Sequence, residues 1–213
     1  MDELHAILQA GLRRLDDEGR LTSEPGTPED LKVVASLFIV DLEMSGPNAQ
    51  VHEVLDIAGV RAALAPRFPE EEAWGGRVRP KRIGNAVPAA LKVVGYSPKA
   101  WKTALELEEA WEKFSTVGRD SVITGWGIGQ DMAFLVETYR QLQRPWPFAP
   151  VALDVQPIAR ALLKGAGTVD RFNLGHVADR LGIGRMGEHG ALADAYATYD
   201  VLVKLLELPL SGS

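Results

Sequence analysis

The sequence predicts a single α/β domain in which helices cover a mixed β-sheet. Two observations lead to this fold class. A chain of 213 residues, with 46% hydrophobic and 24% charged residues, has the size and composition of one soluble globular domain. Predicted strands cluster in the first half of the chain and then alternate with helices, an order that is typical of mixed sheets with helices packed against them.

The first 32 residues differ in pattern from the rest of the chain. Leucine and isoleucine recur there at helical spacing, which predicts an amphipathic helix. The apolar positions of this helix are Leu4, Ile7, Leu8, Leu12 and Leu15. A loop rich in Pro, Gly and Ser follows at 22–30. We therefore interpret 1–32 as an N-terminal helical appendage and 33–208 as the main domain.

Three strands are predicted in the first half of the main domain. The apolar run at 33–40 leads into Asp-Leu-Glu-Met-Ser-Gly and predicts a buried strand. A second strand is expected at 52–64 and a third, with a weaker pattern, at 77–84. The stretch 65–76 between them is rich in Pro, Gly and Glu, so we expect a polar loop there.

The remaining elements alternate between strands and helices. Large apolar residues recur at helical spacing in 98–116, and Pro157 stands where a helix would make its first turn. The full set of later elements is a helix at 98–116, a strand at 121–126, a helix at 131–142, a strand at 151–155, and helices at 157–165, 172–183 and 191–208.

The composition excludes several classes of function. The chain has no cysteine, which rules out disulfides, thiol catalysis, zinc–thiolate sites and iron–sulfur clusters. Its formal net charge of −6 argues against a broad basic face that coats nucleic acid. The longest apolar run, 33–40, is far shorter than the ~20 residues of a membrane-spanning helix. Because the acidic N-terminus does not resemble a signal peptide, we expect a cytoplasmic protein without a membrane partner.

Two carboxylates end the buried strand as Asp41-Leu-Glu43. Residues i and i+2 of a strand point to the same face about 7 Å apart, so these side chains converge at the edge of the sheet. With 13 Asp and 16 Glu in the chain, chance alone predicts about one Asp-x-Glu, and Asp16-x-Glu18 is such a case. A buried strand that delivers two like charges is nevertheless costly without a cation. A metal site is therefore favoured over a solvated strand end.

Asp131 stands at the start of the helix predicted at 131–142. An Asp at a helix N-terminus is stabilised by capping and by the helix dipole, so this position has an ordinary structural explanation. Phe134 and Leu135 follow on the face that Asp131 shares, where they contact a ligand or pack in the core.

His189 and Asp194 lie near the start of the last predicted helix. His189 has glycines at 187 and 190, and an ordinary histidine pKa of about 6.5 suits proton transfer near neutrality. A single histidine in a loop is also compatible with a surface role. His176 is expected to pack or cap a helix, and Asp154 is expected to be structural.

The order of these motifs resembles the DEDDh exonucleases of the RNase T and DnaQ proofreading type. The resemblance covers about residues 34–207, and its most specific part is His-Gly-Ala-Leu-Ala-Asp-Ala at 189–195. It implies a ribonuclease H-like mixed sheet with helices on both faces, so that 33–208 would be the exonuclease domain. It also implies metal-dependent 3′→5′ hydrolysis of phosphodiester bonds that releases 5′-mononucleotides.

The resemblance assigns a role to each motif residue. Asp41, Glu43, Asp131 and Asp194 would bind two Mg²⁺ or Mn²⁺ ions, and His189 would be the general base. Carboxylate oxygens are the hard ligands that these ions prefer. Two such ions about 3.5–4 Å apart stabilise both the attacking and the leaving oxygen of an in-line displacement.

Subfamily signals favour RNA or short oligonucleotides as substrates, with DNA as an alternative. Met44-Ser45-Gly46 is similar to the Met-Thr-Gly of oligoribonucleases, and Trp126-Gly127 looks like the subgroup that trims small structured RNAs. The family's usual His-Asn before the third motif acid is absent. The substrate-binding residues expected from the resemblance are Met44, Ser45, Gly46, Trp126 and Phe134.

The expected partner is single-stranded or 3′-overhanging nucleic acid, and a homodimer is considered as the assembly. Two other functions stay open at this point. One is a non-catalytic binding or regulatory module, and the other is a hydrolase of small phosphoesters that uses the same metals. The basic stretch 77–82 is either a solvated strand edge or an edge that contacts phosphates.

Overall fold

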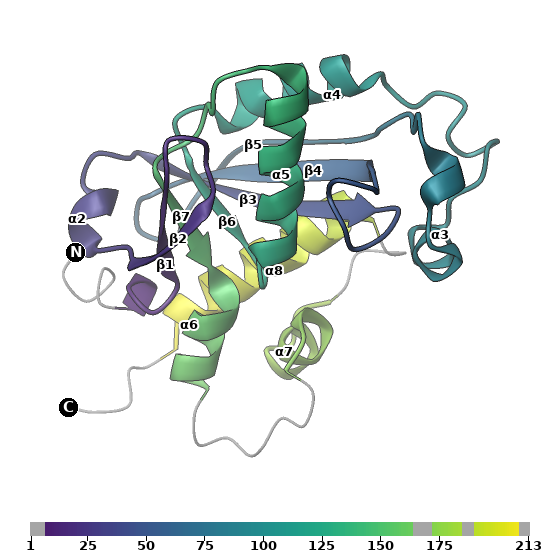
Figure 1. Cartoon of the computed structure of the whole chain (residues 1–213). Coiled ribbons are helices and arrows are strands. Elements are labelled where there is room, and N and C mark those ends of the chain that lie inside the picture. The colour runs from purple at the N-terminus through teal and green to yellow at the C-terminus, as the bar shows by residue number, and fades with distance from the viewer. Residues whose placement is uncertain (1–6, 164–171, 185–189, 209–213) are drawn as a thin grey trace.

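A seven-stranded mixed sheet with helices on both faces forms the centre of the molecule (Figure 1). The computed structural model describes residues 7–163, 172–184 and 190–208. The strand order is β2-β1-β7-β6-β3-β4-β5. The strands are β1 (Leu12–Leu15), β2 (Leu21–Pro25), β3 (Ser36–Met44), β4 (Val54–Ala63), β5 (Glu70–Arg77), β6 (Val122–Gly125) and β7 (Val151–Asp154). The helices are α2 (Pro28–Leu31), the 3₁₀ helix η1 (Ile83–Asn85), α3 (Pro88–Val94), α4 (Leu107–Gly118), α5 (Gly129–Leu142), α6 (Val155–Leu162), α7 (Leu174–Arg180) and α8 (Ala191–Leu206).

Strand β3 lies in the interior of the sheet and is buried on both faces. It pairs antiparallel with β4 and parallel with β6. Leu37 and Ile39 face a core cluster shared with α6, α7 and α8, whereas Phe38 and Val40 face a second cluster shared with α4 and α5. A strand covered on both faces has a continuous apolar sequence instead of an alternating one. The predicted fold class and the buried strand are therefore confirmed.

The N-terminal segment adds two strands to this sheet. β1 pairs antiparallel with β7, and β2 pairs antiparallel with β1. The predicted helix is therefore wrong from Gln9 onward, and the loop expected at 22–30 instead contains most of β2 and the short helix α2. Leu12 and Leu15 pack in different core clusters on opposite faces of the sheet, and a spacing of three residues permits this in a strand as readily as it fits a helix. The division of the chain at residue 32 stays a prediction.

Two predicted elements near the edge of the sheet are wrong. The expected polar loop contains β5, which pairs antiparallel with β4 as the edge strand. The expected strand at 77–84 contributes only Arg77 to β5, and η1 follows at Ile83–Asn85. Acidic residues have low strand propensity, but pairing with β4 determines the structure here.

The predicted helix at 98–116 begins later than expected. Helix α4 starts at Leu107, and Trp101 instead packs beside β4, where its Nε1–H donates to the Leu55 carbonyl at 3.0 Å. Helix α3 precedes this segment and was not predicted. The later strands and helices are confirmed, with ends that shift by a few residues. Within the described ranges, no helix combines the length and apolar character needed to cross a membrane.

Replacing Leu12 with Ala tests whether the N-terminal strands belong to the folding unit of the main domain. Because Leu12 is fully buried, we expect the free energy of unfolding to fall by about 2–5 kcal/mol in urea titrations. Leu21→Ala in β2 is the matched control, since this side chain is 38% exposed. Equal, small losses in both variants would indicate that residues 1–32 are an appendage.

Candidate active site

Three carboxylates meet at the end of β3. Asp41 and Glu43 project from β3, and Asp194 projects from the first turn of α8. One carboxylate oxygen of each residue lies within 4.8 Å of the other two. The i, i+2 spacing on the strand thus brings both acids to one face, as the sequence predicts. The cluster also joins two motifs that are about 150 residues apart in the chain.

Asp131 approaches the same site from α5. Its Oδ1 accepts a hydrogen bond of 3.2 Å from the backbone amide of Leu42, the residue between the two strand acids. Helix α5 begins at Gly129 and has no side-chain cap among its contacts. The carboxylate of Asp131 is therefore directed toward β3 and does not serve as the N-cap of α5, although Asp131 lies in the first turn of that helix, where the expected stabilisation by the helix dipole still applies.

Burial and mutual repulsion make these carboxylates hard to ionise. Burial, followed by the charges of Asp131 and Asp194, raises the pKa of Asp41 well above its usual range. Burial also raises the pKa of Glu43 and of Asp131 to about 7 each. Among the described residues, no Lys or Arg forms an ion pair with any of the four acids. A cluster of this kind is suited to divalent cations, which would supply the missing positive charge.

Asp56 is a fifth acid at the site that the sequence did not reveal. It lies opposite Glu43 in the register of β3 and β4, and its charge raises the pKa of both Asp41 and Glu43. Burial raises the pKa of Asp56 itself, whereas a hydrogen bond from the Ala191 amide and the charge of Arg77 lower it. Asp56 therefore links β4 to the beginning of α8, whose N-cap Gly190 has no side chain for capping.

A cleft of about 520 Å³ adjoins the carboxylate cluster. It is lined by Asp41, Trp126, Asn173, Leu174, Gly175, His176, Asp179 and Asp194. His176 is exposed, and its Nδ1 lies 2.7 Å from the Oδ1 of Asn173, which caps α7. His176 is therefore a cleft residue and is not packed in the core, whereas its contacts with the capping side chain of Asn173 agree with the expected role at a helix start. The other histidine of interest, His189, lies outside the described residues.

Asp154 holds the turn that carries Trp126. Its Oδ1 accepts hydrogen bonds from the Gly127 amide at 2.9 Å and from the Gln156 amide at 3.0 Å, so it also caps α6. Gly127 has φ +64°, a conformation that favours glycine. Trp126 is half-buried and stacks on Phe172 with ring centroids 5.8 Å apart. The structural role expected for Asp154 is confirmed, and Trp126 lines the cleft as a substrate contact requires.

Three of the four other residues expected to contact the substrate are buried within the protein. Ser45 is 1% exposed, and its Oγ accepts a 2.9 Å hydrogen bond from the Glu53 amide. A side chain at Gly46 would collide with the ring of His52. Phe134 is 2% exposed and belongs to the core, which agrees with its alternative explanation as a packing residue. Only Met44 is half-buried, where it packs against the same core cluster.

The chain as a whole is similar to proteins of a known family. The family model of the RNase T type, described as exonuclease, matches residues 38–202. The DNA polymerase III subunit epsilon of Aquifex aeolicus is 26% identical over 189 residues, which cover 85% of this chain and 88% of that protein.

Solved structures with low sequence identity share the fold. E. coli exonuclease I in complex with a dT13 oligonucleotide superposes with a TM-score of 0.66 at 20% identity, covering 81% of this chain. This chain spans 41% of that protein. A 3′-exonuclease that recognises the histone mRNA stem-loop gives a TM-score of 0.66 at 16% identity, covering 82% of this chain and 64% of that one. With its ribonuclease H-like fold, the chain belongs to the RNase T family of exonucleases.

Proposed function

We propose that the chain is a metal-dependent 3′→5′ exonuclease that releases 5′-mononucleotides from nucleic-acid 3′ ends. The observation that carries this proposal is the cluster of Asp41, Glu43 and Asp194 beside an open cleft. The relatives support a nucleic-acid substrate, because one is a DNA polymerase subunit, one was solved with a DNA oligonucleotide, and one recognises an mRNA stem-loop.

The donor set fits two Mg²⁺ or Mn²⁺ ions. Asp41, Glu43, Asp131 and Asp194 would hold them through carboxylate oxygens, the ligand type that these ions prefer. When bound, the ions would stabilise the attacking and leaving oxygens of an in-line displacement. Mutual repulsion within the cluster supports this assignment, because the pKa values of Asp41, Glu43 and Asp131 are all raised and a cation would offset the cost of ionising them.

Other residues would orient the substrate and move a proton. Trp126 would offer its exposed ring surface to a base at the mouth of the cleft, while Asp154 fixes the turn that holds it. Met44 would contact the terminal base. Ser45 and Gly46 would shape the turn after β3 instead of touching the substrate, since Ser45 is fully buried. His189, directly before the helix that carries Asp194, would accept the proton of the attacking water.

Digestion of end-labelled strands tests the activity and its direction. RNA and DNA, single-stranded or with 3′ extensions, are incubated with Mg²⁺ or Mn²⁺. We expect a 3′ label to leave as a mononucleotide and a 5′ label to remain on a shrinking ladder. RNA or short oligonucleotides are the favoured substrates. Release from the 5′ end would contradict the direction.

The same assay separates the two other functions. Hydrolysis of a mononucleotide ester as fast as an oligomer would indicate a small-phosphoester hydrolase. Strand binding without hydrolysis, even with Mn²⁺, would indicate a non-catalytic module. The homodimer stays a prediction, and sedimentation velocity of the full chain tests it.

Metal binding should reverse a pH-dependent loss of stability. In chelator, the folded state binds protons at Glu43 and Asp131 more tightly than the unfolded state does, because the pKa of each is raised to about 7. The proton binding of Glu43 and Asp131 therefore adds to the free energy of unfolding at acidic pH. This contribution is lost as the pH rises toward and through 7. Asp131→Asn should flatten this dependence in calorimetric scans, because the amide does not titrate. Its oxygen can still accept the hydrogen bond from the Leu42 amide, so the contact with β3 is kept.

Saturating Mn²⁺ should then stabilise the protein most above pH 7. An ion concentration 100-fold above its dissociation constant contributes about 2.7 kcal/mol, which raises the Tm of a chain of this length by roughly 5–10 °C. Thermal scans at acidic and alkaline pH measure the effect. An equal Mn²⁺ shift in wild-type protein and in Asp41→Asn would contradict the proposed ligand set.

A further inference from the structure

Residues 78–105, between β5 and α4, form a basic arm in an otherwise acidic chain. The arm contains six Lys or Arg residues and neither Asp nor Glu. The other residues hold 17 Lys or Arg against 29 acids. The net charge of −6 therefore conceals a segment of +6. A concentrated charge of one sign attracts ligands of the other sign and raises their association rate.

The arm is a folded unit and not a loose loop. Trp101 is 4% exposed and anchors the arm to β4 through its hydrogen bond to Leu55. The ring of Tyr96 packs on Trp101 with centroids 5.1 Å apart. The two ends of the arm are joined by the Arg79 amide, which donates to the Leu105 carbonyl at 2.8 Å. Its charged side chains are consequently carried on a fixed frame.

The arm is attached to the loop that follows the carboxylate-bearing strand. The Val87 amide, at the start of α3, donates to the Ser45 carbonyl at 2.8 Å, only two residues beyond Glu43. The Arg82 guanidinium donates to the Gln50 carbonyl at 3.1 Å. Figure 1 shows α3 beyond the ends of β3 and β4, at the end of the sheet where α8 begins. The arm therefore extends the surface of the active site.

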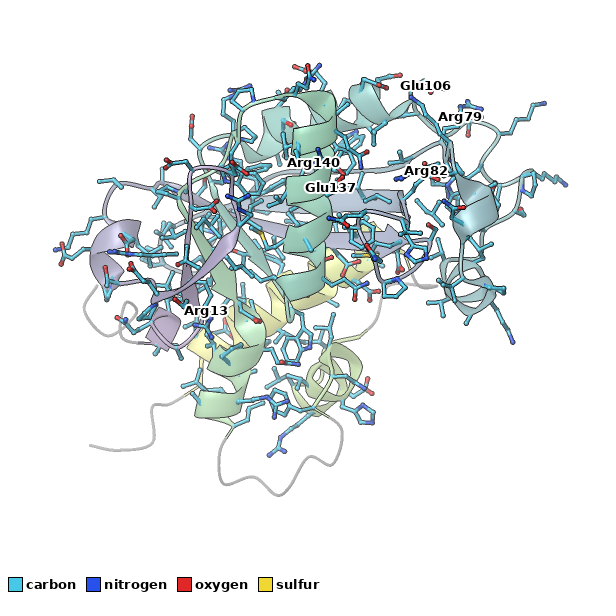
Figure 2. The ribbon with its side chains drawn as sticks, in the orientation of Figure 1. Arg13, Arg79, Arg82, Glu106, Glu137 and Arg140 are labelled. Atoms are coloured by element: carbon cyan, nitrogen blue, oxygen red, sulfur yellow. The ribbon has the colours of Figure 1, made fainter. Side chains whose placement is uncertain are left out.

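Three of the six cations of the arm form ion pairs with acidic residues outside it. Arg79 pairs with Glu106 at 2.7 Å, Lys81 with Glu108 at 3.6 Å, and Arg82 with Glu53 at 3.7 Å. Figure 2 shows Arg79, Arg82 and Glu106 together where the arm joins the sheet. Arg77, the fourth cation of the basic stretch at 77–82, donates to the Ala100 carbonyl at 2.8 Å. Each cation of that stretch thus has a partner in the protein, which fits its interpretation as a solvated strand edge.

The other three cations are free to bind. Lys92, Lys99 and Lys102 are exposed, and none of the ion pairs within the described ranges includes them. A lysine ammonium on a flexible stem contacts phosphate as a point charge without reading base identity. Three such groups on one frame suit a polyanion that extends outward from the carboxylate cluster.

We propose that the basic arm binds the phosphate backbone of the substrate strand on the 5′ side of the nucleotide being removed. Lys92, Lys99 and Lys102 supply the contacts, so strands long enough to reach the arm bind more tightly than dinucleotides. This inference rests on the proposed exonuclease function and adds a length preference to it. Because the contacts are to phosphate, the arm acts on RNA and DNA alike.

Charge reversal of the three lysines tests the arm. The variant Lys92→Glu/Lys99→Glu/Lys102→Glu is compared with Lys32→Glu/Lys113→Glu/Lys204→Glu, which changes the net charge equally at exposed positions on other elements. RNA and DNA strands of two to sixteen nucleotides share one 3′ terminus. Hydrolysis is measured with each variant, and binding is measured by fluorescence anisotropy with Asp41→Ala added to each.

The arm variant should lose affinity for long strands only. We expect Kd for the sixteen-nucleotide strand to rise about tenfold at low salt, and the slope of log K against log salt to become shallower by about 2. KM for the dinucleotide and the Tm of the protein should stay near the wild-type values. The control variant should change long-strand binding less than twofold.

The outcomes separate the arm from the exonuclease proposal. The arm proposal would be overturned if the two triple variants lost affinity for long strands equally. It would also be overturned if the arm variant lost affinity for the dinucleotide and the long strand equally. In both cases hydrolysis by the wild type would still support the exonuclease proposal. Binding of anionic lipid vesicles without strand binding would overturn the arm proposal too. If the wild type hydrolyses nothing but its length-dependent binding is lost in the arm variant, the exonuclease proposal fails, whereas phosphate binding by the three lysines stands.

Discussion

Asp41→Ala is expected to abolish hydrolysis while the protein stays folded. Asp41 shares the carboxylate cluster with Glu43 and Asp194, and the charges of Asp131 and Asp56 also act on it. Its removal would deprive the proposed ions of their central ligand. We expect the single-turnover rate with Mn²⁺ to fall by at least about 10²–10³-fold, the scale of losing one electrostatic contact to the transition state.

Stability measurements distinguish this loss from unfolding. Burial and the neighbouring acids raise the pKa of Asp41, so that its ionised form is unfavourable and its replacement should not destabilise the metal-free protein above pH 7. Asp200→Ala, at an exposed position further along the helix that carries Asp194, is the matched control and should keep its activity. Full hydrolysis by a folded Asp41→Ala protein would show that the chemistry occurs elsewhere.

The parts of the fold with strong local patterns were predictable from the sequence. β3 is recognisable because its apolar run is rich in β-branched residues and ends shortly before Ser-Gly-Pro. The helices α5 and α8 follow from their periodic apolar faces. In contrast, Leu12 and Leu15 fit a helix and a strand buried on two faces equally well. The local pattern could not decide, because their partner β7 lies more than 130 residues away.

Elements defined by distant pairing were missed for the same reason. β5 begins with Glu70, Glu71 and Glu72, which indicate a loop when taken alone. Hydrogen bonding to β4 makes this stretch an edge strand, and edge strands commonly carry charges.

In the candidate site, too, some features follow from a local sequence pattern, whereas others depend on residues that are far apart in the chain. The convergence of Asp41 and Glu43 follows from strand geometry, and it is found as predicted. Asp56 depends on the register between β3 and β4, which no local pattern gives. The burial of Ser45 and Phe134 is likewise a property of the assembled core.

His189→Ala is expected to lower the rate of hydrolysis by roughly 10²–10⁴-fold at neutral pH, because it removes the proposed general base. Strand affinity, measured by anisotropy, should change little, since proton transfer contributes to the rate and not to binding of the phosphate backbone. An unchanged rate would contradict the assignment. The wild-type rate should also fall as the pH decreases through the pKa of the histidine, ordinarily about 6.5, because a protonated imidazole cannot accept the proton of water.

His176 makes this experiment decisive, since it is a second histidine beside the same carboxylates. It lines the cleft with Asp41 and Asp194, and Asn173 engages its Nδ1. His176→Ala is therefore the comparison that matters. If His189 is the base, His176→Ala should lose less than about tenfold in rate and keep the acidic limb of the pH profile, while His189→Ala loses that limb. The reverse pattern would move the role of base to α7. The profiles are recorded with Mn²⁺ saturating at every pH, so that titration of Glu43 and Asp131 does not limit the rate and, of the two histidines, only the one that accepts the proton imposes its own titration.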